Sequence, residues 1–523
     1  MPDNLIAFEN EHLLVINKPA GWNTHAPSPY AGEGVYDWLK HREPRWANLS
    51  IIHRLDKETS GLIVFGKTTL ANRSLSAQFE SRSVQKTYVL LTARPVKFQT
   101  FTAKSRIARA GDVYRSAANG EPAETEFRLL GQTNLGYLVE ARPITGRTHQ
   151  IRVHAAENGF PILGDTLYGG SSFPRVCLQA RELRLVDPEN GKETTFTAEP
   201  DFAEDPRVAL RAMIDAQETN AFRLIHGASD GWPGWYVEKL GDFLLSQSEQ
   251  PISEKQKEYL QLVTEGMRGV YHKTLSRHIR GAAIQQTSPE LILGDAAPEE
   301  FTIRENGVNF AMKFNEGYSV GLFLDQRDNR RRFLVNHVAA QFPLVSNPSS
   351  AEVLNTFSYT CGFSVCAAKL GARVTSLDLS KKYLDWGKRN FALNQIDPEQ
   401  HDFIFGDTFD WLRRLAKKGR SFDAIILDPP TFSQSKESGV FRADKDYGKL
   451  VQSALGVLKP SGVLLCSTNA AELKPEKFLE MVRAGVVTSR RRITKQHYVP
   501  QPPDFPVSRE EPAYLKTVWL RVA

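Results

Sequence analysis

Cysteine is scarce in this chain, with four residues among 523 and no C-x-x-C pair. So few thiols argue against a disulfide framework and a zinc finger, and they are typical of a protein of the reducing cytoplasm. Long apolar runs are also missing, since nothing approaches the roughly 18 unbroken apolar residues of a membrane span. The first residues lack a basic segment followed by an apolar core, so no signal peptide is expected. The sequence therefore predicts a cytoplasmic protein with no membrane partner.

Two site signatures are absent as well. The chain has no G-x-G-x-x-G, which argues against a dinucleotide cofactor. His149 and His154 are five residues apart and lack the spacing of a helical zinc site, so no metal is expected. No internal repeats or low-complexity tracts occur, and 41% hydrophobic with 24% charged residues is an ordinary soluble composition.

The pattern of residues divides the chain into three regions. Residues 1–200 contain short alternating runs separated by turn signals, which predicts an α+β domain with a mixed, largely antiparallel sheet. This pattern stops near residues 198–206, where prolines and acidic residues cluster. Residues 205–340 are predicted to form a small α+β middle domain. Residues 341–523 alternate strand, glycine turn and helix, which predicts a Rossmann-like, doubly wound α/β domain.

Residues 53–61 (HRLDKETSG) are the most informative stretch of the first region. Asp56 stands beside Arg54 and Lys57, and nearby positive charge favours an ionised carboxylate. An apolar run at residues 62–65 follows and is predicted to be a strand, with Gly61 at its sharp entry. An anionic Asp anchored to a strand suits nucleophilic carboxylate chemistry, while a structural Arg–Asp pair on a loop is the alternative.

Residues 53–61 resemble the catalytic motif of the RluA family of pseudouridine synthases. Residues 86–90 (KTYVL) resemble the family's second motif, which carries a Tyr. Residues 145–154 (TGRTHQIRVH) resemble the third, and Gly-Asp and Leu-Tyr-Gly follow at residues 164–169. Three long motifs in the family's order make this resemblance specific, and it covers roughly residues 5–190.

The resemblance implies roles for individual residues. Asp56 would attack the uridine or its sugar while the base is freed and re-attached through carbon. Tyr88 would stack on the base and assist proton transfer, and Arg147 would pair with Asp56. The substrate would also be contacted by Arg54, His149 and Arg152. No cofactor is implied, because bonds break and form within one nucleotide. The family's usual small N-terminal RNA-binding domain is not expected, since the first strand starts near residue 5.

A second site is predicted in the third region. A strand at residues 351–357 runs into a turn and then a helix, and a second strand ends at Asp378. An acid about twenty residues beyond a strand-to-helix turn is well placed to hold ribose hydroxyls. Another apolar strand ends in Asp428, followed by Pro429 and Pro430. Proline restricts its own backbone and that of the preceding residue, so Asp428 is held in a fixed direction.

These segments resemble class I S-adenosylmethionine-dependent methyltransferases of large-subunit ribosomal RNA. The likeness rests on residues 321–327 (GLFLDQR), 357–360 (FSYT) and 428–433 (DPPTFS) with Ser435 and Lys436. It implies that S-adenosyl-L-methionine is the cofactor. The cofactor's methionine end would be held by Asn355, Thr356 and Gly362, its ribose by Asp378 and its adenine edge by Asp407, and Asp428 would lie by the transferring methyl. Phe357 and Pro429 are also expected to bind the cofactor.

Differences from the family pattern bear on the target base. Cys361 stands where a glycine is usual. In the cytosine-C5 branch a nucleophilic Cys stands where Asn469 aligns here, and an amide cannot form the covalent adduct that C5 methylation needs. Cys466 lies on an apolar strand and is interpreted as a core residue. The guanine-N7 branch has Asn at this position and resembles residues 377–386 better, so we predict methylation of guanine N7. Phe432 is predicted either to stack on the target base or to pack.

Basic residues support a polyanionic partner. The net charge is +6 and the pI about 8.9. Four arginines crowd residues 327–332, and three more occupy residues 490–492. Taken singly, each run is typical of a solvated basic face. Beside two RNA-type catalytic segments, such runs favour phosphate contacts, so Arg327 and Arg330 are predicted to bind RNA.

The sequence thus predicts a bifunctional enzyme of rRNA or tRNA, a pseudouridine synthase joined to a methyltransferase. One alternative is a monofunctional rRNA methyltransferase, for guanine N7 or cytosine C5, whose front half only binds RNA. The intact Asp56, Tyr88 and Arg147 argue against it. Another alternative is a DNA amino-methyltransferase, because Asp-Pro-Pro also precedes an aromatic residue in those enzymes. Here Thr431 intervenes before Phe432.

Overall fold

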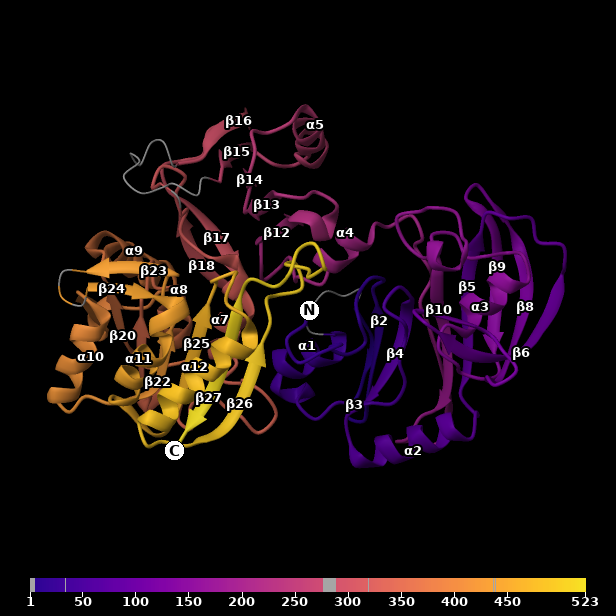
Figure 1. Ribbon diagram of the computed structural model, residues 1–523, viewed down its shortest axis with the longest axis horizontal. Helices are drawn as coiled ribbons and strands as arrows, with labels where there is room; N and C mark the ends of the chain where they lie inside the picture. Colours follow the sequence, from indigo (N-terminus) through magenta and orange to yellow (C-terminus); the bar gives the residue numbers. More distant parts are fainter. Residues whose placement is uncertain (1–4, 33, 276–287, 318, 436, 438) are drawn as a thin grey trace. The chain divides into compact units, whose positions relative to one another are not determined.

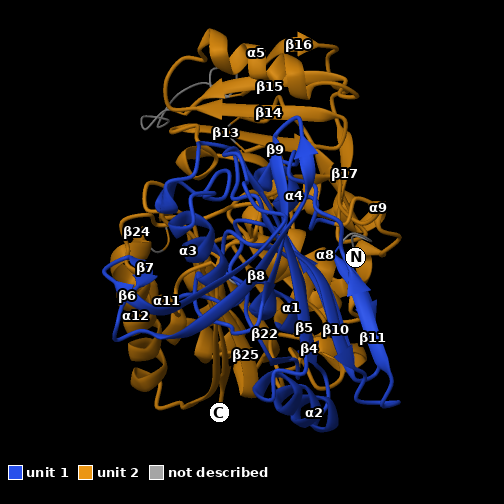
Figure 2. Ribbon diagram, turned by 90° about the vertical axis from the view of Figure 1, so that its right-hand side faces the viewer, with its two compact units in different colours: residues 1–27, 33–40, 48–214 blue, residues 28–32, 41–47, 215–523 orange. Residues whose placement is uncertain are grey.

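The computed structural model describes residues 5–32, 34–275, 288–317, 319–435, 437 and 439–523. Lys436, one of the residues in the methyltransferase resemblance, lies outside them. The chain separates into two compact units (Figure 2). Unit 1 comprises residues 1–27, 33–40 and 48–214, and unit 2 comprises residues 28–32, 41–47 and 215–523. No helix of the described residues has the length and apolar character needed to cross a membrane.

Unit 1 is built on an eleven-stranded sheet (Figure 1). Its main path runs β1-β2-β4-β10-β5-β9-β8-β6-β7, with β3 paired to β4 and β11 paired to β10. The β4–β10 pair is parallel and the other described pairs are antiparallel, as the alternating pattern predicts. The strands are β1 (Ile6–Glu9), β2 (Leu13–Lys18), β3 (Ser50–Ile51), β4 (Ser60–Gly66), β5 (Gln85–Thr92), β6 (Thr100–Ala110), β7 (Val113–Ser116), β8 (Glu121–Thr133), β9 (Gly136–Pro143), β10 (Leu178–Val186) and β11 (Glu193–Thr197).

Apolar clusters hold this sheet to its helices. In one, Leu75 of α2 packs with Leu62 and Val64 of β4. In another, Ile151 of α3 packs with Phe127 of β8 and neighbouring strands. Period-two alternation along the strands places these side chains on the covered faces. The helices are α1 (Val35–Arg42), α2 (Thr69–Glu80), α3 (Gln150–Glu157) and α4 (Pro206–Arg211).

The first part of unit 2 is a five-stranded sheet in the order β12-β13-β14-β15-β16. Helix α5 crosses between the parallel strands β14 and β15, and its Leu260 packs against Trp235 and Val237. A hairpin, β17–β18, follows. The elements are β12 (Ala221–His226), β13 (Trp235–Leu240), β14 (Phe243–Ser248), α5 (Glu254–Val263), β15 (Gly269–Thr274), β16 (Glu290–Gly294), β17 (Phe301–Glu305) and β18 (Val308–Met312).

The second part of unit 2 is a seven-stranded sheet in the order β21-β20-β19-β22-β25-β27-β26. The first five strands run parallel, and β27 is antiparallel to both of its neighbours. The elements are α7 (Arg327–Leu334), β19 (Glu352–Thr356), α8 (Gly362–Lys369), β20 (Arg373–Asp378), α9 (Lys381–Leu393), β21 (Asp402–Phe405), α10 (Thr408–Lys417), β22 (Phe422–Leu427), β23 (Phe432–Ser435), β24 (Gly439–Arg442), α11 (Ala443–Leu455), β25 (Leu458–Thr468), α12 (Pro475–Thr488), β26 (Ile493–Val499) and β27 (Lys516–Val522).

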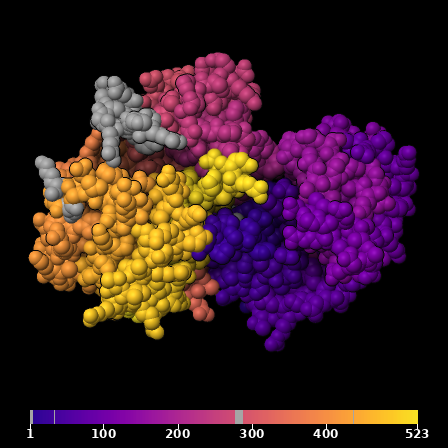
Figure 3. Space-filling view, viewed as in Figure 1, coloured from indigo at the N-terminus to yellow at the C-terminus, as the bar shows by residue number. Residues whose placement is uncertain are grey.

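Both faces of this sheet are buried, which explains its continuous apolar strands. Ile426 of β22 belongs to the cluster that includes Phe363 of α8, while the adjacent Ile425 belongs to the cluster with Leu412 of α10. The predicted doubly wound α/β domain is therefore confirmed. Figure 3 shows C-terminal residues, in yellow, at the surface of this unit.

Candidate functional sites

The first predicted catalytic acid, Asp56, lies in the loop that leads into β4. Gly61, at φ +115°, lets β4 approach β10 closely, because a Cβ there would collide with the carbonyl oxygen of Ala180. The buried ammonium group of Lys18 donates to the carbonyl oxygens of Pro19 (2.9 Å), Trp22 (2.7 Å) and Lys57 (3.2 Å). Burial lowers the pKa of Lys18 to about 7, although the negative charges of Glu58 and Asp56 act to raise it. Lys18 thus fixes the residue directly after Asp56, a role that its local sequence did not reveal.

Two cationic or ionisable side chains of the third motif approach Asp56. The distance from Asp56 Oδ2 is 3.8 Å to His149 Nε2 and 4.0 Å to Arg152 Nη1. Arg152 is buried and donates from Nε and Nη2 to both oxygens of Asp165, each at 2.7 Å. Burial alone would lower the pKa of Arg152, but hydrogen bonding to Asp165 and its charge raise it. Arg152 is therefore a fixed positive charge beside Asp56.

His149 is held by its neighbours. Its Nδ1 lies 2.8 Å from the hydroxyl oxygen of Tyr168, and that oxygen accepts a hydrogen bond from the backbone N–H of Tyr114 at 2.9 Å. Burial lowers the pKa of His149, although the charge of Asp56 opposes this. The ring is therefore oriented toward Asp56 by contacts on its far side.

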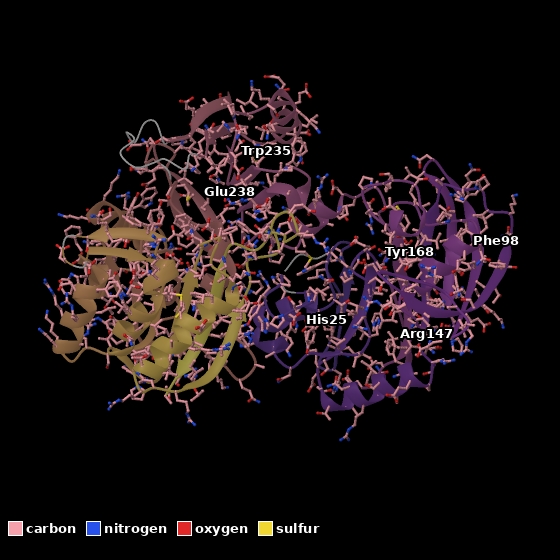
Figure 4. The ribbon with its side chains drawn as sticks, viewed as in Figure 1. His25, Phe98, Arg147, Tyr168, Trp235 and Glu238 are labelled. Carbon is pink, nitrogen blue, oxygen red and sulfur yellow. The ribbon has the colours of Figure 1, made fainter. Side chains whose placement is uncertain are left out.

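The prediction that Arg147 pairs with Asp56 is corrected by the structure. Arg147 Nη1 lies 2.6 Å from Glu121, and Nε donates to the carbonyl oxygen of Pro122 at 3.1 Å. The reason is local: His149 has φ +56°, so the chain reverses between Arg147 and the first turn of α3, and Arg152 faces Asp56 instead. Arg147 and Tyr168 are labelled in Figure 4.

The predicted Tyr88 lies on β5 and lines the same cleft as Asp56. Burial, and then the negative charge of Asp56, raise the pKa of Tyr88 well above its usual value. The phenol therefore stays protonated at neutral pH. It can donate a proton or a hydrogen bond in this cleft, as the resemblance to pseudouridine synthases implies.

The cleft has a volume of about 1050 Å³ and is rich in positive charge. The predicted residues that line it include Arg54, Asp56, Tyr88, Arg147, His149 and Arg152. Burial lowers the pKa of another lining residue, Lys86. Clefts lined by one sign of charge attract and concentrate ligands of the opposite sign. The cationic lining residues are Arg54, Lys57, Arg82, Lys86, Arg142, Arg147, Arg152 and Arg184, against the acidic Asp56, Glu126 and Glu182.

The second predicted site lies at the carboxyl ends of the parallel strands in unit 2. Asn355 Nδ2 donates to Ser364 Oγ at 2.9 Å, and Thr356 Oγ1 donates to the Ile426 carbonyl oxygen at 2.6 Å. Both side chains are buried, so they fix the turn after β19, and any part in cofactor binding falls to their backbone. Gly362 begins α8, where a Cβ would lie 2.8 Å from Leu322.

This turn is strained. Phe357, Tyr359 and Cys361 all have positive φ, of 53°, 48° and 64°. Left-handed backbone is costly for residues other than glycine, and such residues cluster at functional sites. The side chain of Cys361 packs where a Cβ on Gly387 of α9 would stand. Gly387 therefore makes room for the Cys that replaces the family's glycine.

Two acids of the predicted cofactor site are held in place. Asp378 accepts backbone hydrogen bonds from Tyr359 and Ser380, each at 2.8 Å, and burial raises its pKa. Each carboxylate oxygen keeps a further lone pair for a ligand. Asp407 caps α10 by accepting from the N–H of Asp410 at 2.9 Å. The two acids thus fix the ends of β20 and β21.

Leu379 and Phe405 are 40% and 60% exposed beside these acids. These two side chains form exposed apolar surface, and neither was predicted from the sequence to bind the cofactor. Leu379 directly follows Asp378, and Phe405 lies two residues before Asp407. This closeness in sequence to two predicted cofactor-binding acids could have identified them.

Asp428 follows β22 and faces neutral donors. Gln326 Nε2 donates to Asp428 Oδ2 at 3.1 Å and to Ser467 Oγ at 2.7 Å. Burial, and then the charge of Asp325, raise the pKa of Asp428 to about 7. Pro429 is buried beside it. Gln326 and Ser467 were not assigned from the sequence, because neither belongs to the Asp-Pro-Pro segment.

The prediction that Arg327 and Arg330 bind RNA is wrong. Arg327 is 3% exposed and donates to both oxygens of Asp504, at 2.9 and 2.5 Å. Arg330 is 2% exposed and donates to both oxygens of Glu305, at 2.6 and 2.7 Å. Their guanidinium groups neutralise buried carboxylates contributed by distant segments. In the second basic run, Arg491 donates to backbone carbonyl oxygens, including that of Leu458 at 2.8 Å.

The remaining predictions concern Cys466 and Phe432. Cys466 has no exposed surface and belongs to an apolar cluster, so its interpretation as a core residue is confirmed. Burial raises the pKa of its thiol, which disfavours the nucleophilic thiolate. Asn469 is exposed just beyond β25. Phe432 is 37% exposed on β23, where it has surface available for stacking.

Known protein families match both halves of the chain. A family described as RNA pseudouridylate synthase matches residues 12–157. A family described as S-adenosylmethionine-dependent methyltransferase matches residues 223–521.

Individual relatives agree with the methyltransferase match. A ribosomal RNA large subunit methyltransferase of Deinococcus radiodurans is 33% identical over 359 residues, covering 67% of this chain and 84% of the relative. Ribosomal RNA large subunit methyltransferase I of Aeromonas salmonicida is 31% identical over 394 residues, covering 73% and 92%. A crystal structure of a methyltransferase complexed with SAH is 26% identical with a TM-score of 0.53, covering 65% of this chain and 87% of that one.

Proposed function

Because this chain belongs to the S-adenosylmethionine-dependent methyltransferase family and also carries an RNA pseudouridylate synthase domain, we propose that it is a bifunctional rRNA-modifying enzyme. It converts one uridine to pseudouridine and methylates guanine N7. We assign the isomerase to residues 1–200, the methyltransferase to residues 341–523, and an RNA-contacting role to the middle domain, residues 205–340. Its relatives' names support large-subunit rRNA as the substrate.

The isomerase proposal rests on the convergence of Asp56, Tyr88 and Arg152 in one cationic cleft. Asp56 supplies a carboxylate that attacks the nucleotide, while Arg152 and His149 face it. The bond from the sugar to uracil N1 breaks, a bond from the sugar to C5 forms, N1 gains a proton and C5 loses one. The protonated phenol of Tyr88 is suited to move a proton during this exchange. The lining cations bind the phosphates.

The residues at the ends of β19, β20 and β21 fit S-adenosylmethionine. Asp378 and Asp407 offer carboxylates for hydroxyl and amino groups, and the exposed Leu379 and Phe405 offer apolar surface for adenine. When bound, this cofactor supplies an electrophilic methyl group. Asp428 lies at the neighbouring strand end with the rigid Pro429, where it can orient the target and balance developing positive charge.

Guanine N7 is the target that this site supports best. Its lone pair is already nucleophilic, so methylation needs alignment and exclusion of water more than a catalytic base. Methylation of cytosine C5 needs a thiolate at C6. All four cysteines of the chain are buried, and Cys466, the one nearest in sequence to the aligned position, is in the core.

Nucleoside mass spectrometry tests both activities. Large-subunit rRNA from a strain lacking this gene should have lost one pseudouridine and one 7-methylguanosine. Expression of Asp56→Ala should restore the methylated base without the pseudouridine, and Asp428→Ala should restore the pseudouridine without the methylated base. Each variant is the control for the other.

The alternatives give different results. Pseudouridine that persists at every site in the deletion strain contradicts the isomerase and favours an RNA-binding front half. Loss of 5-methylcytidine in place of 7-methylguanosine contradicts the choice of base. Methylation of DNA but not of rRNA by the purified protein favours the DNA enzyme.

A further inference from the structure

A second acid, Asp325, lies beside Asp428. It belongs to the 3₁₀ turn Leu324–Gln326, and the next residue, Gln326, donates directly to Asp428 Oδ2 at 3.1 Å. Asn329 Nδ2 in turn donates to Gln326 Oε1 at 2.7 Å, which fixes the Gln326 side chain. The side chain of Gln326 therefore links the turn that carries Asp325 to Asp428, the acid proposed to act in methyl transfer.

The two oxygens of Asp325 have different environments. Oδ2 accepts a hydrogen bond from the hydroxyl of Tyr514 at 3.0 Å. Oδ1 is buried and accepts no hydrogen bond from any residue that the structure describes. Buried polar atoms are nearly always satisfied, so an orphan of this kind in a native protein calls for a partner.

The nearby arginines donate no hydrogen bond to Asp325 Oδ1. Arg330 directs Nε and Nη2 to Glu305, and Nη2 also donates to the carbonyl oxygen of Phe323. Arg223 directs Nη2 to Glu238 at 2.7 Å. Burial raises the pKa of Asp325, while the hydrogen bond from Tyr514 and the charges of Arg223 and Arg330 oppose the increase. Oδ1 therefore remains an acceptor without a donor among the described residues, on a carboxylate close enough to raise the pKa of Asp428.

We propose that Asp325 recognises the target base, with Oδ1 accepting hydrogen bonds from the N1–H and amino N–H groups of guanine. This inference rests on the proposed methyl transfer to guanine N7 and adds the specificity residue of that site. A carboxylate suits this edge of guanine, because two donors lie side by side on it. Adenine and cytosine each present a ring nitrogen acceptor at the equivalent place, and its lone pair would repel the carboxylate. A site built to hydrogen-bond N–H groups rejects bases that lack them.

The first test is Asp325→Asn in the full-length protein, with large-subunit rRNA from the deletion strain as substrate. A hydrogen bond to a charged group is lost, so kcat/KM for methylation should fall about 10- to 100-fold. Binding of S-adenosylhomocysteine and pseudouridine formation should both stay unchanged. The matched control is Asp385→Asn, an exposed acid on α9, which should methylate normally. An unchanged methylation rate in Asp325→Asn overturns the proposal, and so does weakened S-adenosylhomocysteine binding, which indicates a structural role.

A second test probes the contact from the side of the RNA and works even if the variant fails to fold. Transcripts of the mapped target segment are made with guanosine or inosine at the methylated position, since inosine lacks the amino group. The wild-type protein should methylate the inosine transcript about tenfold more slowly, and Asp325→Asn should show little further loss. Equal wild-type rates on the two transcripts overturn the assignment of Asp325 alone. If the wild-type protein methylates a base other than guanine, both this assignment and the proposed target fail.

Discussion

Asp56 of unit 1 and Asp428 of unit 2 are the same residue type in opposite environments. Asp56 is 30% exposed, and its carboxylate faces His149 and Arg152 at 3.8 and 4.0 Å. Asp428 is half-buried against an amide, a hydroxyl and a second acid, and its pKa is raised to about 7. Desolvation beside a like charge favours the neutral form of Asp428. Asp56 instead has solvent access and a guanidinium group at 4.0 Å.

The position on the sheet differs as well. Asp56 lies in the loop before its strand, in a mixed sheet whose cleft is lined by long cationic side chains. Asp428 lies directly after β22, at the carboxyl end of a parallel sheet whose strands β20 and β21 hold Asp378 and Asp407 at the same edge. The first arrangement is suited to a polyanion around one acid, and the second is suited to a small ligand held by several acids. The following predictions test this contrast.

The largest effect is expected for Arg152→Met in unit 1. Loss of the guanidinium group leaves the buried carboxylate of Asp165 without its Arg152 partner. The free energy of local unfolding should therefore fall by about 3–5 kcal/mol. Hydrogen–deuterium exchange of α3 peptides measures this cost, and pseudouridine formation should fall together with it. Arg147→Met is the matched control: its partner Glu121 is exposed, so the loss should be about 0–1 kcal/mol. Equal losses for the two variants would contradict the pairing described here.

A smaller effect is expected from pH on the methyl transfer of unit 2. The raised pKa of Asp428 means that its carboxyl group is largely protonated at pH 6 and largely ionised at pH 8. If the anion balances the positive charge on methylated guanine, the single-turnover rate at saturating cofactor should rise about tenfold over this range. Asp325 raises this pKa and Arg330 lowers it, so Asp325→Asn should shift the midpoint to lower pH. A flat profile would show that the ionised form is not required.

The smallest effect is expected for Phe432→Ala. Stacking of a base on an aromatic ring contributes about 1–3 kcal/mol, and a partly exposed ring such as Phe432 is expected at the low end, so the KM for RNA should rise about fivefold. Val440→Ala, on the paired strand β24 and 51% exposed, is the control and should change KM little. Equal KM values for Phe432→Ala and Val440→Ala would indicate that Phe432 serves only to pack.

Much of the fold and of each site follows from local sequence. The strand after Gly61 and the doubly wound pattern beyond residue 341 were both predictable, because period-two alternation and glycine turns are local properties. Asp56, Tyr88 and Asp428 were predicted instead from short motifs that resemble those of known families, and each motif is a continuous stretch of the chain. Gln326, Asp325 and Lys18 were missed, because each acts through contacts with residues distant in the sequence or through backbone carbonyl oxygens.

The charged residues show where local reasoning fails. The four crowded arginines read as a basic surface, yet Arg327 and Arg330 are buried against Asp504 and Glu305. Asp504 is 177 residues from Arg327, so nothing near the run indicates that its charge is neutralised. A run of cations in sequence is therefore weak evidence for a cationic face.

By itself, the sequence determined the order of the two domains and pointed to Asp56 and Asp428 as the predicted acids, because the motifs that carry them are short continuous stretches of residues. Only the tertiary structure decided which cation meets which acid. Arg152 rather than Arg147 approaches Asp56 because the backbone of His149 is left-handed. Arg327 is buried rather than exposed because it pairs with Asp504, a residue far along the chain. Side-chain direction and long-range pairing are set by packing, and no short stretch of residues encodes them.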